Sequence, residues 1–421
     1  MTLPHSLRAF RHRDYRLYFA GQGISQTGTW LQLIATSWLV YQLSGSAFLL
    51  GLAAFTLHIP ILVLGPFAGV WVDRQKKRSV LLRTQTAALA QSVVMLALIA
   101  FGQVEAWHLI LANLVLGVVN AFDSPARQSQ LVELVGGKDD LPSAIAFSSL
   151  LMNGARFIGP MIGGAVIAGL GVVWGFGLNT LMRGAVILAL WLIRAEPRPT
   201  EKTTDKWQQQ LAAGFRYAYG FLPTRSALLL LSATSLAVQP YQSLAPYFAR
   251  DVFHGGSEVL GYLLGAGGFG AVSGMVYLAM RPSVRGLLSL IPFTAATAGG
   301  ALIVFSFASS LWLALPMLFL VGMGTMLSAA STNTVLQTIV EDRMRARVVS
   351  IYMMSFLGVT PVGALFAGML AERIGPPVTL ALGGGLALAA AFVYWLHLGA
   401  IRNAIRPIYQ KLGIVPRPDE P

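Results

Sequence analysis

The fold is decided by the stretch GLAAFTLHIPILVLGPFAGVWVDRQKKR, residues 51–78. From Gly51 to Val72 this stretch contains no Asp, Glu, Lys or Arg, and a helix of that length crosses a hydrocarbon core about 30 Å thick. The charged residues follow at once, as Asp73, Arg74, Lys76, Lys77 and Arg78. An apolar block that ends in a basic cluster is typical of a membrane-spanning helix followed by a cytoplasmic loop.

The rest of the chain repeats this pattern. Of its 421 residues, 55% are hydrophobic and 11% are charged, whereas about 25% of the residues of an ordinary soluble domain are charged. Apolar blocks long enough to span a bilayer recur, and they predict an all-α polytopic membrane protein of twelve transmembrane helices. The predicted spans are 15–42, 47–72, 80–102, 107–128, 142–168, 172–194, 226–249, 257–280, 287–308, 311–338, 346–371 and 377–398.

The basic residues predict the orientation of these helices, because Lys and Arg in short loops resist translocation. With a cytoplasmic N-terminus, all but four of the 30 Lys and Arg residues fall in the tails, the central linker or the cytoplasmic loops. The exceptions are Arg156, Arg183, Arg250 and Arg373. We therefore expect a multi-pass protein of the bacterial inner membrane with both termini in the cytoplasm. The same placement accounts for the net charge of +13 without nucleic acid as a partner.

Several function classes are excluded by composition. The chain has no cysteine, which rules out disulfides, thiol catalysis and Cys metal sites. The sequence shows no phosphate loop, no Ser/His/Asp constellation and no metal-ligand cluster, so we expect neither an enzyme nor a cofactor or metal site. The apolar stretch after the basic residues 1–15 is too long for a cleaved signal peptide, and we expect it to be retained as the first helix.

Weak internal repeats indicate two six-helix halves. Residues 46–51 open the second span much as residues 257–261 open the eighth, and residues 159–160 find a counterpart in residues 360–361. Parallel repeats of this kind place a substrate site between the halves, near the bilayer midplane. The predicted domains are a bundle at 1–194, a linker at 195–225 with an amphipathic helix over 205–221, a bundle at 226–398 and a tail at 399–421.

The loop at residues 69–78, GVWVDRQKKR, resembles the signature loop of the major facilitator superfamily, Gly-x-x-x-Asp-Arg followed by basic residues. The resemblance implies a conformational latch, in which Asp73 caps the N-terminus of a helix in the opposite half. Unpaired N–H groups and the helix dipole favour an acid at such a place. One departure is Lys76, where the family usually has glycine. The alternative is that the loop only carries charge for topology. The latch residues are Gly69, Asp73, Arg74, Lys77 and Arg78, together with Asp123 and Arg127.

The helix expected at 107–128 ends in NAFDSPARQ, in which Asp123 and Arg127 are four residues apart on one helical face. In related transporters an acid of this helix pairs with a basic residue of the signature loop. The resemblance therefore implies a contact of Asp123 with Lys77 or Arg78. A purely structural ion-pair cluster is the alternative, and a proton-carrying role of Asp123 stays open.

The helix expected at 142–168 contains ARFIGPMIGG, which resembles the antiporter motif of drug exporters. Ala155 stands where that motif usually has a further glycine. Small residues let helices approach closely and the proline permits a bend, so plain helix packing is the alternative to a role in export. The residues of this motif are Arg156, Gly159, Pro160, Gly163 and Gly164.

Two arginines lie inside predicted spans. Arg156 is about 20 Å along its helix, where an unpaired cation is costly, and it is therefore a candidate for contact with an anionic substrate. Arg183 lies in a helix that is usually peripheral in this superfamily, and we expect a structural role for it.

Proton coupling has two candidate residues within the bundle. Most acids map to helix ends or loops, and only Asp123 and His58 could titrate inside. The ordinary pKa of histidine suits proton exchange, although a histidine just before Pro60 also fits simple packing.

The first, fourth, seventh and tenth helices line the central cavity in this superfamily. Amide and aromatic side chains on these helices would suit an amphipathic organic substrate. The candidates are Gln22, Gln26, Trp30, Gln32, Asn113, Asn120, Gln239, Tyr241, Gln242 and Asn333, with Arg156.

Taken together, the signature loop, residues 123–128, residues 159–160 and residues 213–217 resemble the branch of the major facilitator superfamily that holds the enterobactin exporter and macrolide efflux pumps. The resemblance covers nearly the whole chain. It implies two pseudo-symmetric six-helix bundles, alternating access and proton antiport. We expect a monomeric secondary transporter in the lipid bilayer that exports a siderophore, drug-like or other small amphipathic molecule. A lysolipid flippase, a proton-independent importer and a non-transporting membrane sensor are the alternatives.

Overall fold

The computed structural model describes residues 5–135, 140–193, 207–281 and 283–415, and the regular secondary structure in these ranges is helical. The chain divides into two compact units. Unit 1 comprises Met1–Lys202 and Ala245–Gly265, and unit 2 comprises Thr203–Leu244 and Ala266–Pro421.

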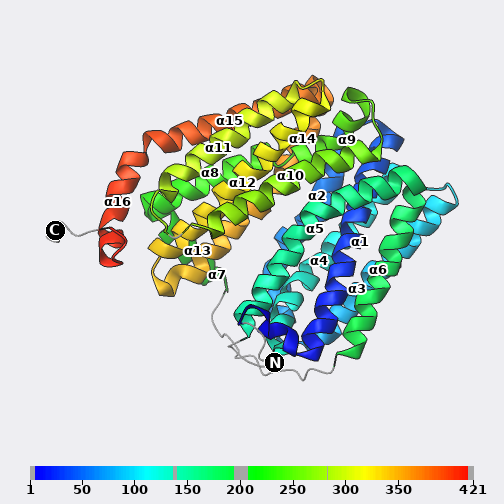
Figure 1. The fold of residues 1–421 in the computed structure, drawn as a ribbon, viewed down its shortest axis with the longest axis horizontal. Helices are drawn as coiled ribbons and strands as arrows, with labels where there is room; N and C mark the ends of the chain where they lie inside the picture. Colours follow the sequence, from blue (N-terminus) through cyan, green and yellow to red (C-terminus); the bar gives the residue numbers. More distant parts are fainter. Residues whose placement is uncertain (1–4, 136–139, 194–206, 282, 416–421) are drawn as a thin grey trace. The chain divides into compact units, whose positions relative to one another are not determined.

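Unit 1 is a bundle of long helices. In it, α1 packs against α5 and α6, α2 packs against α4, and α3 packs against α4 and α6 (Figure 1). The close approach of α2 and α4 depends on Gly117, where a Cβ atom would lie 2.5 Å from the carbonyl oxygen of Leu57. The elements are the 3-10 helix His5–Arg11, α1 (Arg13–Ser44), α2 (Ala47–Asp73), α3 (Lys77–Ala100), α4 (Ala106–Leu134), α5 (Leu141–Leu170) and α6 (Val172–Leu192).

The second part of the chain continues with shorter and more interrupted elements. In unit 2, α11 packs against α12 and α15, and α8 packs against α15. The elements of residues 207–411, of which 245–265 belong to unit 1, are α7 (Trp207–Gly220), α8 (Leu222–Val238), α9 (Tyr241–Tyr247), a π-helical turn at Phe248–Val252, α10 (Ser257–Ala279), α11 (Leu287–Ser306), α12 (Leu311–Ile339), α13 (Asp342–Met353), a π-helical turn at Met354–Gly358, α14 (Thr360–Ile374), α15 (Pro376–Leu396) and α16 (Leu398–Lys411).

The predicted fold class, an all-α polytopic membrane protein, is confirmed. Ten helices of the described residues are long and apolar enough to cross a membrane, and eleven if the bent pair Gly214–Gly220 and Leu222–Val252 forms one span. The remaining predicted position is α1, which has 32 residues but carries polar side chains such as Gln22 and Gln26 along its length. Helices therefore occupy all twelve predicted positions.

Two predicted spans are interrupted. The span expected at 226–249 is divided between α8, α9 and a π-helical turn, and the span expected at 346–371 between α13, a second π-helical turn and α14. Prolines stand at both breaks, Pro240 between α8 and α9 and Pro361 at the start of α14. Because proline has no N–H group, the regular i to i−4 ladder cannot continue through it.

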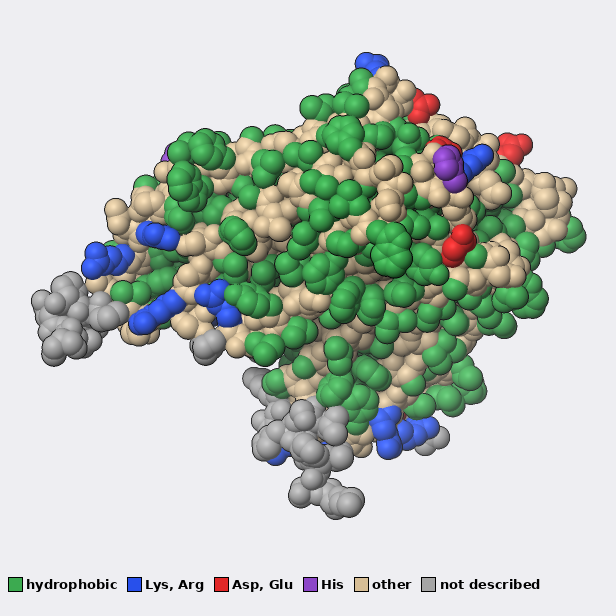
Figure 2. Space-filling view, turned by 45° about the horizontal axis from the view of Figure 1, so that its top comes forward, with side chains coloured by type: hydrophobic (Ala, Val, Ile, Leu, Met, Phe, Trp, Pro, Cys, Tyr) green, Lys and Arg blue, Asp and Glu red, His purple; other side chains and the backbone are tan. Residues whose placement is uncertain are grey.

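The outer surface of both units is rich in large apolar side chains, as the green atoms of Figure 2 show. Phe67 and Trp191 of unit 1 are 58% and 68% exposed, and Trp312 and Trp395 of unit 2 are 88% and 60% exposed. A water-soluble protein rarely exposes so much contiguous apolar surface, whereas lipid tails solvate it.

The segments outside the spans contain two amphipathic helices. The linker helix expected over 205–221 is α7, and its residues Phe215 and Ala218 pack into the core of unit 2 as their spacing predicts. The first half of the tail predicted at 399–421 is helical, as α16. α16 forms there because Ile401, Ile405 and Tyr409 recur on one face and are buried.

Candidate functional site

The interior of unit 1 contains a hydrogen-bonded polar network. The Gln32 amide on α1 accepts hydrogen bonds from Asn179 (2.8 Å) and Arg183 (3.2 Å) of α6, and it donates one to Gln91 of α3 (3.0 Å). Asn179 also donates to the Ser92 hydroxyl at 2.8 Å. Three helices are thus joined by side chains in a region where water does not compete, which makes each bond sensitive to the others.

A second cluster surrounds the acid of α4. Asp123 is 1% exposed and pairs with Arg127 one turn later on the same helix. Its carboxylate also accepts hydrogen bonds from the Thr84 hydroxyl and the Gln85 amide of α3, both at 2.8 Å. Arg127 reaches across to the Gln26 amide oxygen of α1 at 3.4 Å. The Asp123–Arg127 pair therefore ties three helices together.

The charges of this interior do not balance. Asp123 offsets Arg127, but Arg183 is 4% exposed and forms no ion pair among the described residues. Its Nε atom is buried without a hydrogen-bond partner in that part of the chain. A buried guanidinium with a single amide acceptor is costly in a membrane and is usually kept for function.

The predicted pairing of Asp123 with the signature loop is wrong. The Lys77 ammonium donates to the carbonyl oxygens of Val72 (3.1 Å) and Asp73 (2.8 Å) at the end of α2. The Arg78 guanidinium donates to the carbonyl oxygens at the end of α6, Leu190 at 2.8 Å and Trp191 at 2.7 Å. Helix C-termini carry unpaired carbonyls and negative partial charge, so both cations are already satisfied there.

The other latch residues lie at the end of α2. Asp73 is its last residue, its side chain is exposed, and no described residue forms an ion pair with its carboxylate. Arg74 follows as the C-cap, and Gly69 has open space where a Cβ atom would stand. The predicted capping of a helix in the opposite half by Asp73 stays a prediction.

The α5 motif serves close packing. A Cβ atom on Gly159 would lie 2.6 Å from Trp30 of α1, and one on Gly164 would lie 2.9 Å from the Cα atom of Gly261 at the start of α10. Gly163 faces Leu31 and Ile34 of α1. The packing interpretation therefore accounts for these glycines, and it leaves a role in export untested.

Arg156 lies near this motif but belongs to neither polar cluster. Its side chain is half-buried, and it forms no hydrogen bond or ion pair with another described residue. Arg183, expected in a peripheral helix, lies in the polar network. The predicted contact of Arg156 with an anionic substrate stays a prediction.

His58 and the predicted cavity residues are dispersed. The His58 side chain is exposed on α2, and its Nδ1 bonds to the Ala54 carbonyl at 2.9 Å. Four of the amide candidates take part in hydrogen bonds: Asn113 donates to Ala53, Gln242 donates to Gln239, and Asn333 accepts from Gln337. Tyr241 is buried near Gly267, and Asn120 is half-buried. Gln22 is buried, and its amide nitrogen has no partner in the described structure.

Several residues of the two clusters were missed from the sequence, although a signal was present. On α3, Thr84 and Gln91 are seven residues apart, as are Gln85 and Ser92. Seven residues are close to two helical turns, so this spacing gives α3 a polar stripe inside an otherwise apolar span. Residues of that kind inside a membrane helix face the bundle interior.

Sequence comparison with known proteins places this chain in a family. The sequence profile of the transmembrane secretion effector family matches residues 5–407. The staphyloferrin A transporter of Staphylococcus aureus is 24% identical over 383 residues, which cover 90% of this chain and 95% of the relative. The multidrug efflux pump Tap of Mycolicibacterium fortuitum is 28% identical over 363 residues, with 83% and 87% covered. The enterobactin exporter EntS of Citrobacter koseri is 25% identical over 407 residues, with 94% of both chains covered.

Solved structures agree on the fold. The nucleoside transporter NupG superposes with a TM-score of 0.71 at 12% identity, covering 91% of this chain and 98% of that one. A peptide transporter POT superposes with a TM-score of 0.71 at 13% identity, covering 93% and 96%. At such low identity the likeness describes the helical architecture and carries nothing about substrates.

Proposed function

Because this chain belongs to the transmembrane secretion effector family of the major facilitator superfamily, we propose that it exports small amphipathic organic molecules of the siderophore or drug-like class. It works as a secondary active transporter by alternating access. The observation that carries the proposal is the length of the match. Family likeness runs over residues 5–407, and relatives named for a siderophore and for drugs are covered along nearly their whole length.

The polar clusters of unit 1 support transport over a passive role. A membrane sensor without flux could fill its interior with apolar side chains, at lower cost than buried charges. Here Asp123 and Arg183 are buried within an apolar bundle, and Arg127 lies half-buried beside Asp123. Bonds between α1, α3, α4 and α6 that depend on these charges change strength when an ion or a ligand alters the local charge.

We assign proton coupling to Asp123 in preference to His58. Protonation of Asp123 would remove the partner of Arg127 and release its bonds to α3 in one step. His58 has its Nδ1 committed to the Ala54 carbonyl and contacts no charged group of the described structure. Among the described residues, a proton on His58 therefore has no charged contact through which it could move a helix.

The surroundings of the protein complete the proposal. The chain is a multi-pass membrane protein of a bacterial transporter family. We place it in the inner membrane as a monomer with both termini in the cytoplasm, since the basic loops favour that orientation. Its partners are then a small-molecule substrate, a proton and the lipid bilayer.

Purified protein in proteoliposomes tests this function directly. Vesicles holding a pH-sensitive dye are given a panel of siderophores and macrolide antibiotics, with and without an imposed proton gradient. We expect gradient-dependent movement of at least one compound together with proton flux in the opposite direction. Movement without a gradient would favour the proton-independent importer, flipping of a lysolipid alone would favour the flippase, and no flux of any compound would overturn the proposal.

A further inference from the structure

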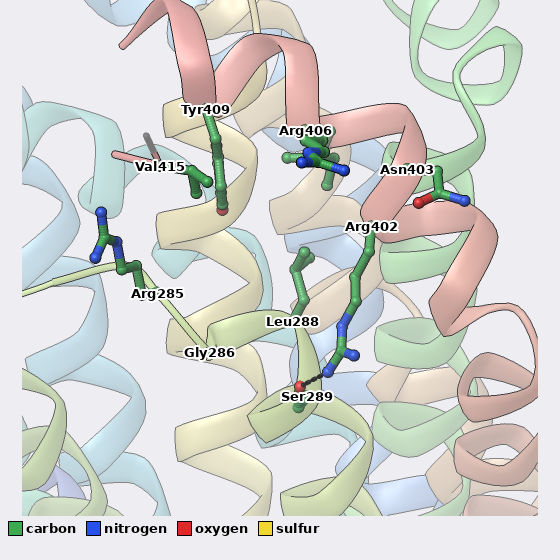
Figure 3. Close-up of a pocket in the computed structure, with 10 residues that line it drawn as sticks. Arg285, Gly286, Leu288, Ser289, Arg402, Asn403, Arg406, Tyr409 and Val415 are labelled. Carbon is green, nitrogen blue, oxygen red and sulfur yellow. Dashed lines mark hydrogen bonds between the residues drawn. The ribbon is translucent and has the colours of Figure 1, made fainter. Parts of the chain in front are cut away.

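A basic pocket lies at one end of unit 2. It has a volume of about 430 Å³ and opens to the surface between α16 and the start of α11 (Figure 3). Three arginines line it, Arg285 before α11 and Arg402 and Arg406 on α16. Figure 2 shows Lys and Arg side chains gathered at the end of unit 2 where the chain terminates.

The local sequence builds this pocket. Arg402, Arg406 and Tyr409 are four and three residues apart, which places them along one flank of α16. The neighbouring face buries Ile401 and Ile405 in the core of unit 2 and so fixes the helix in position. Gly286, with φ +80°, makes the turn into α11 that only glycine adopts without strain.

Two of the three guanidinium groups donate hydrogen bonds to neutral partners. Arg402 donates to the Ser289 hydroxyl at 2.6 Å, and Arg285 donates to the carbonyl oxygen of Ile414. Arg406 has no hydrogen-bond partner among the described residues. No described carboxylate forms an ion pair with any of the three. The pocket therefore presents concentrated positive charge with most of its donors unused.

A buried hydroxyl faces the same space. Tyr409 lines the pocket and is 6% exposed, yet its hydroxyl has no hydrogen-bond partner in the described structure. Burial raises the pKa of the Tyr409 phenol above its ordinary value, so the group stays a neutral donor at physiological pH. Buried hydroxyls without partners are uncommon, and one beside three arginines marks the place of an absent acceptor.

The position of the pocket identifies the kind of anion. α11 starts at Leu287 and α15 ends at Leu396, and both are spans, so the pocket lies at the boundary between lipid and water. Trp395 and Leu396 are each 60% exposed at the end of α15, where acyl chains can cover them. We propose that this pocket binds the phosphate of an anionic phospholipid headgroup. Guanidinium groups bind phosphate oxygens in pairs, and the phenol adds a further donor.

Lipid binding by the detergent-purified full chain tests the proposal. Short-chain phosphatidylglycerol, short-chain phosphatidylcholine and inorganic phosphate are titrated separately and followed by native mass spectrometry. We expect phosphatidylglycerol to bind at least about tenfold more tightly than either of the others, since it alone supplies net charge and acyl chains. Equal binding of phosphatidylcholine, or binding of inorganic phosphate as tight as that of phosphatidylglycerol, would overturn the lipid assignment.

Matched variants locate the site. Arg406→Gln should weaken phosphatidylglycerol binding by about tenfold, and Tyr409→Phe by about threefold to fivefold without any change in charge. Lys411→Gln removes the same charge from an exposed position of α16 outside the pocket and should leave the affinity unchanged. If Lys411→Gln matches Arg406→Gln, or if Tyr409→Phe binds like the parent protein, the pocket is not the site. Retained transport in these variants shows that they are folded.

Discussion

The interiors of the two units differ in the kind of polar residue that they bury. Unit 1 buries charged side chains, Lys77, Asp123, Asp140 and Arg183, whereas the buried polar residues described in unit 2 are uncharged. Several of those return their hydrogen bond to their own helix, as Thr234 does to Leu230. Charged side chains of unit 2 such as Arg216 and Arg373 are exposed, and three arginines gather in the pocket beside α16. The comparison teaches that two bundles of similar architecture divide their tasks, with charge-dependent contacts between helices concentrated in unit 1.

The largest effect is expected when the negative charge of Asp123, the buried acid of α4, is removed. Asp123→Asn leaves Arg127 and Arg183 without a buried counter-charge and should lower the free energy of unfolding by about 3–5 kcal/mol, besides abolishing transport. Unfolding in mixed micelles with increasing SDS measures the loss. The double variant Asp123→Asn with Arg127→Gln should recover part of the lost free energy of unfolding, because position 127 then carries no cation that needs the Asp123 carboxylate.

A matched change in unit 2 provides the control. Ser331 is fully buried, and its hydroxyl has no partner among the described residues. Ser331→Ala should change the free energy of unfolding by less than about 1 kcal/mol, because it removes an unpaired group. A loss as large as that of Asp123→Asn would show that the two interiors respond alike and would contradict the comparison.

The next effect separates function from stability. Arg183→Met removes the buried cation that lacks an acid and keeps much of its volume. Transport should fall by about tenfold or more, while the protein unfolds at the same or a higher SDS fraction, because burying that charge was costly. Transport assays and unfolding curves on one preparation decide this, with Arg156→Met as the comparison from α5. Equal loss of both properties would make Arg183 a structural residue.

A smaller effect is expected at the exposed end of α2. Asp73→Asn should lower the transport rate severalfold and change the free energy of unfolding by no more than about 0.5 kcal/mol, since Asp73 is exposed. Initial rates in proteoliposomes of equal protein content measure it. Arg74→Gln, next to it, tests whether charge in general or the acid in particular matters. Unchanged flux in Asp73→Asn would remove the latch.

The smallest effect concerns the charged end of unit 1. A hydrogen bond from His12 (2.8 Å), followed by the nearby Arg11 guanidinium (2.6 Å), lowers the pKa of Asp140 below its ordinary value. An acid whose pKa is lower in the folded state than in the unfolded state stabilises the fold above the unfolded pKa. For Asp140 this stabilisation is lost as the pH falls below about 4.

Asp140→Asn should therefore flatten the acid side of the unfolding profile and change little near pH 7 beyond the lost contact. Unfolding midpoints between pH 7 and pH 3 measure this, and Asp14→Asn on α1 serves as the control. An unchanged acid limb would show that the N-terminal 3-10 helix gains nothing from Asp140.

The sequence predicted the spans well because each must satisfy its backbone within one helix and present apolar side chains to lipid. Boundaries fell within a few residues for most helices, as at 47–72 against Ala47–Asp73. The interruption at Met354–Gly358 was less visible, since its residues carry no charge and are as apolar as those of the regular helices. The helix α16 was missed because its apolar residues are spaced between arginines and resemble a basic tail.

The candidate site was predicted in part. Asp123 and Arg127 were found from their spacing of four, and Gln26 and Gln32 from their polar character on the first helix. The partners of Asp123 were not, because Thr84 and Gln85 lie on another helix and are chosen by the rotation of α3 about its axis. No local pattern records that rotation.

What the sequence by itself determined is the solvent and the helical architecture, through apolar blocks long enough to span a bilayer. Only the tertiary structure decided which polar side chains meet. In it, Lys77 and Arg78 bind carbonyl oxygens at helix ends, and Arg183 lies in the interior of unit 1. Arg402 and Arg406 of α16 line one pocket with Arg285. The physical reason is that lipid tails solvate any apolar helix equally well, whereas a buried charge is tolerated only where a particular partner lies within hydrogen-bond distance.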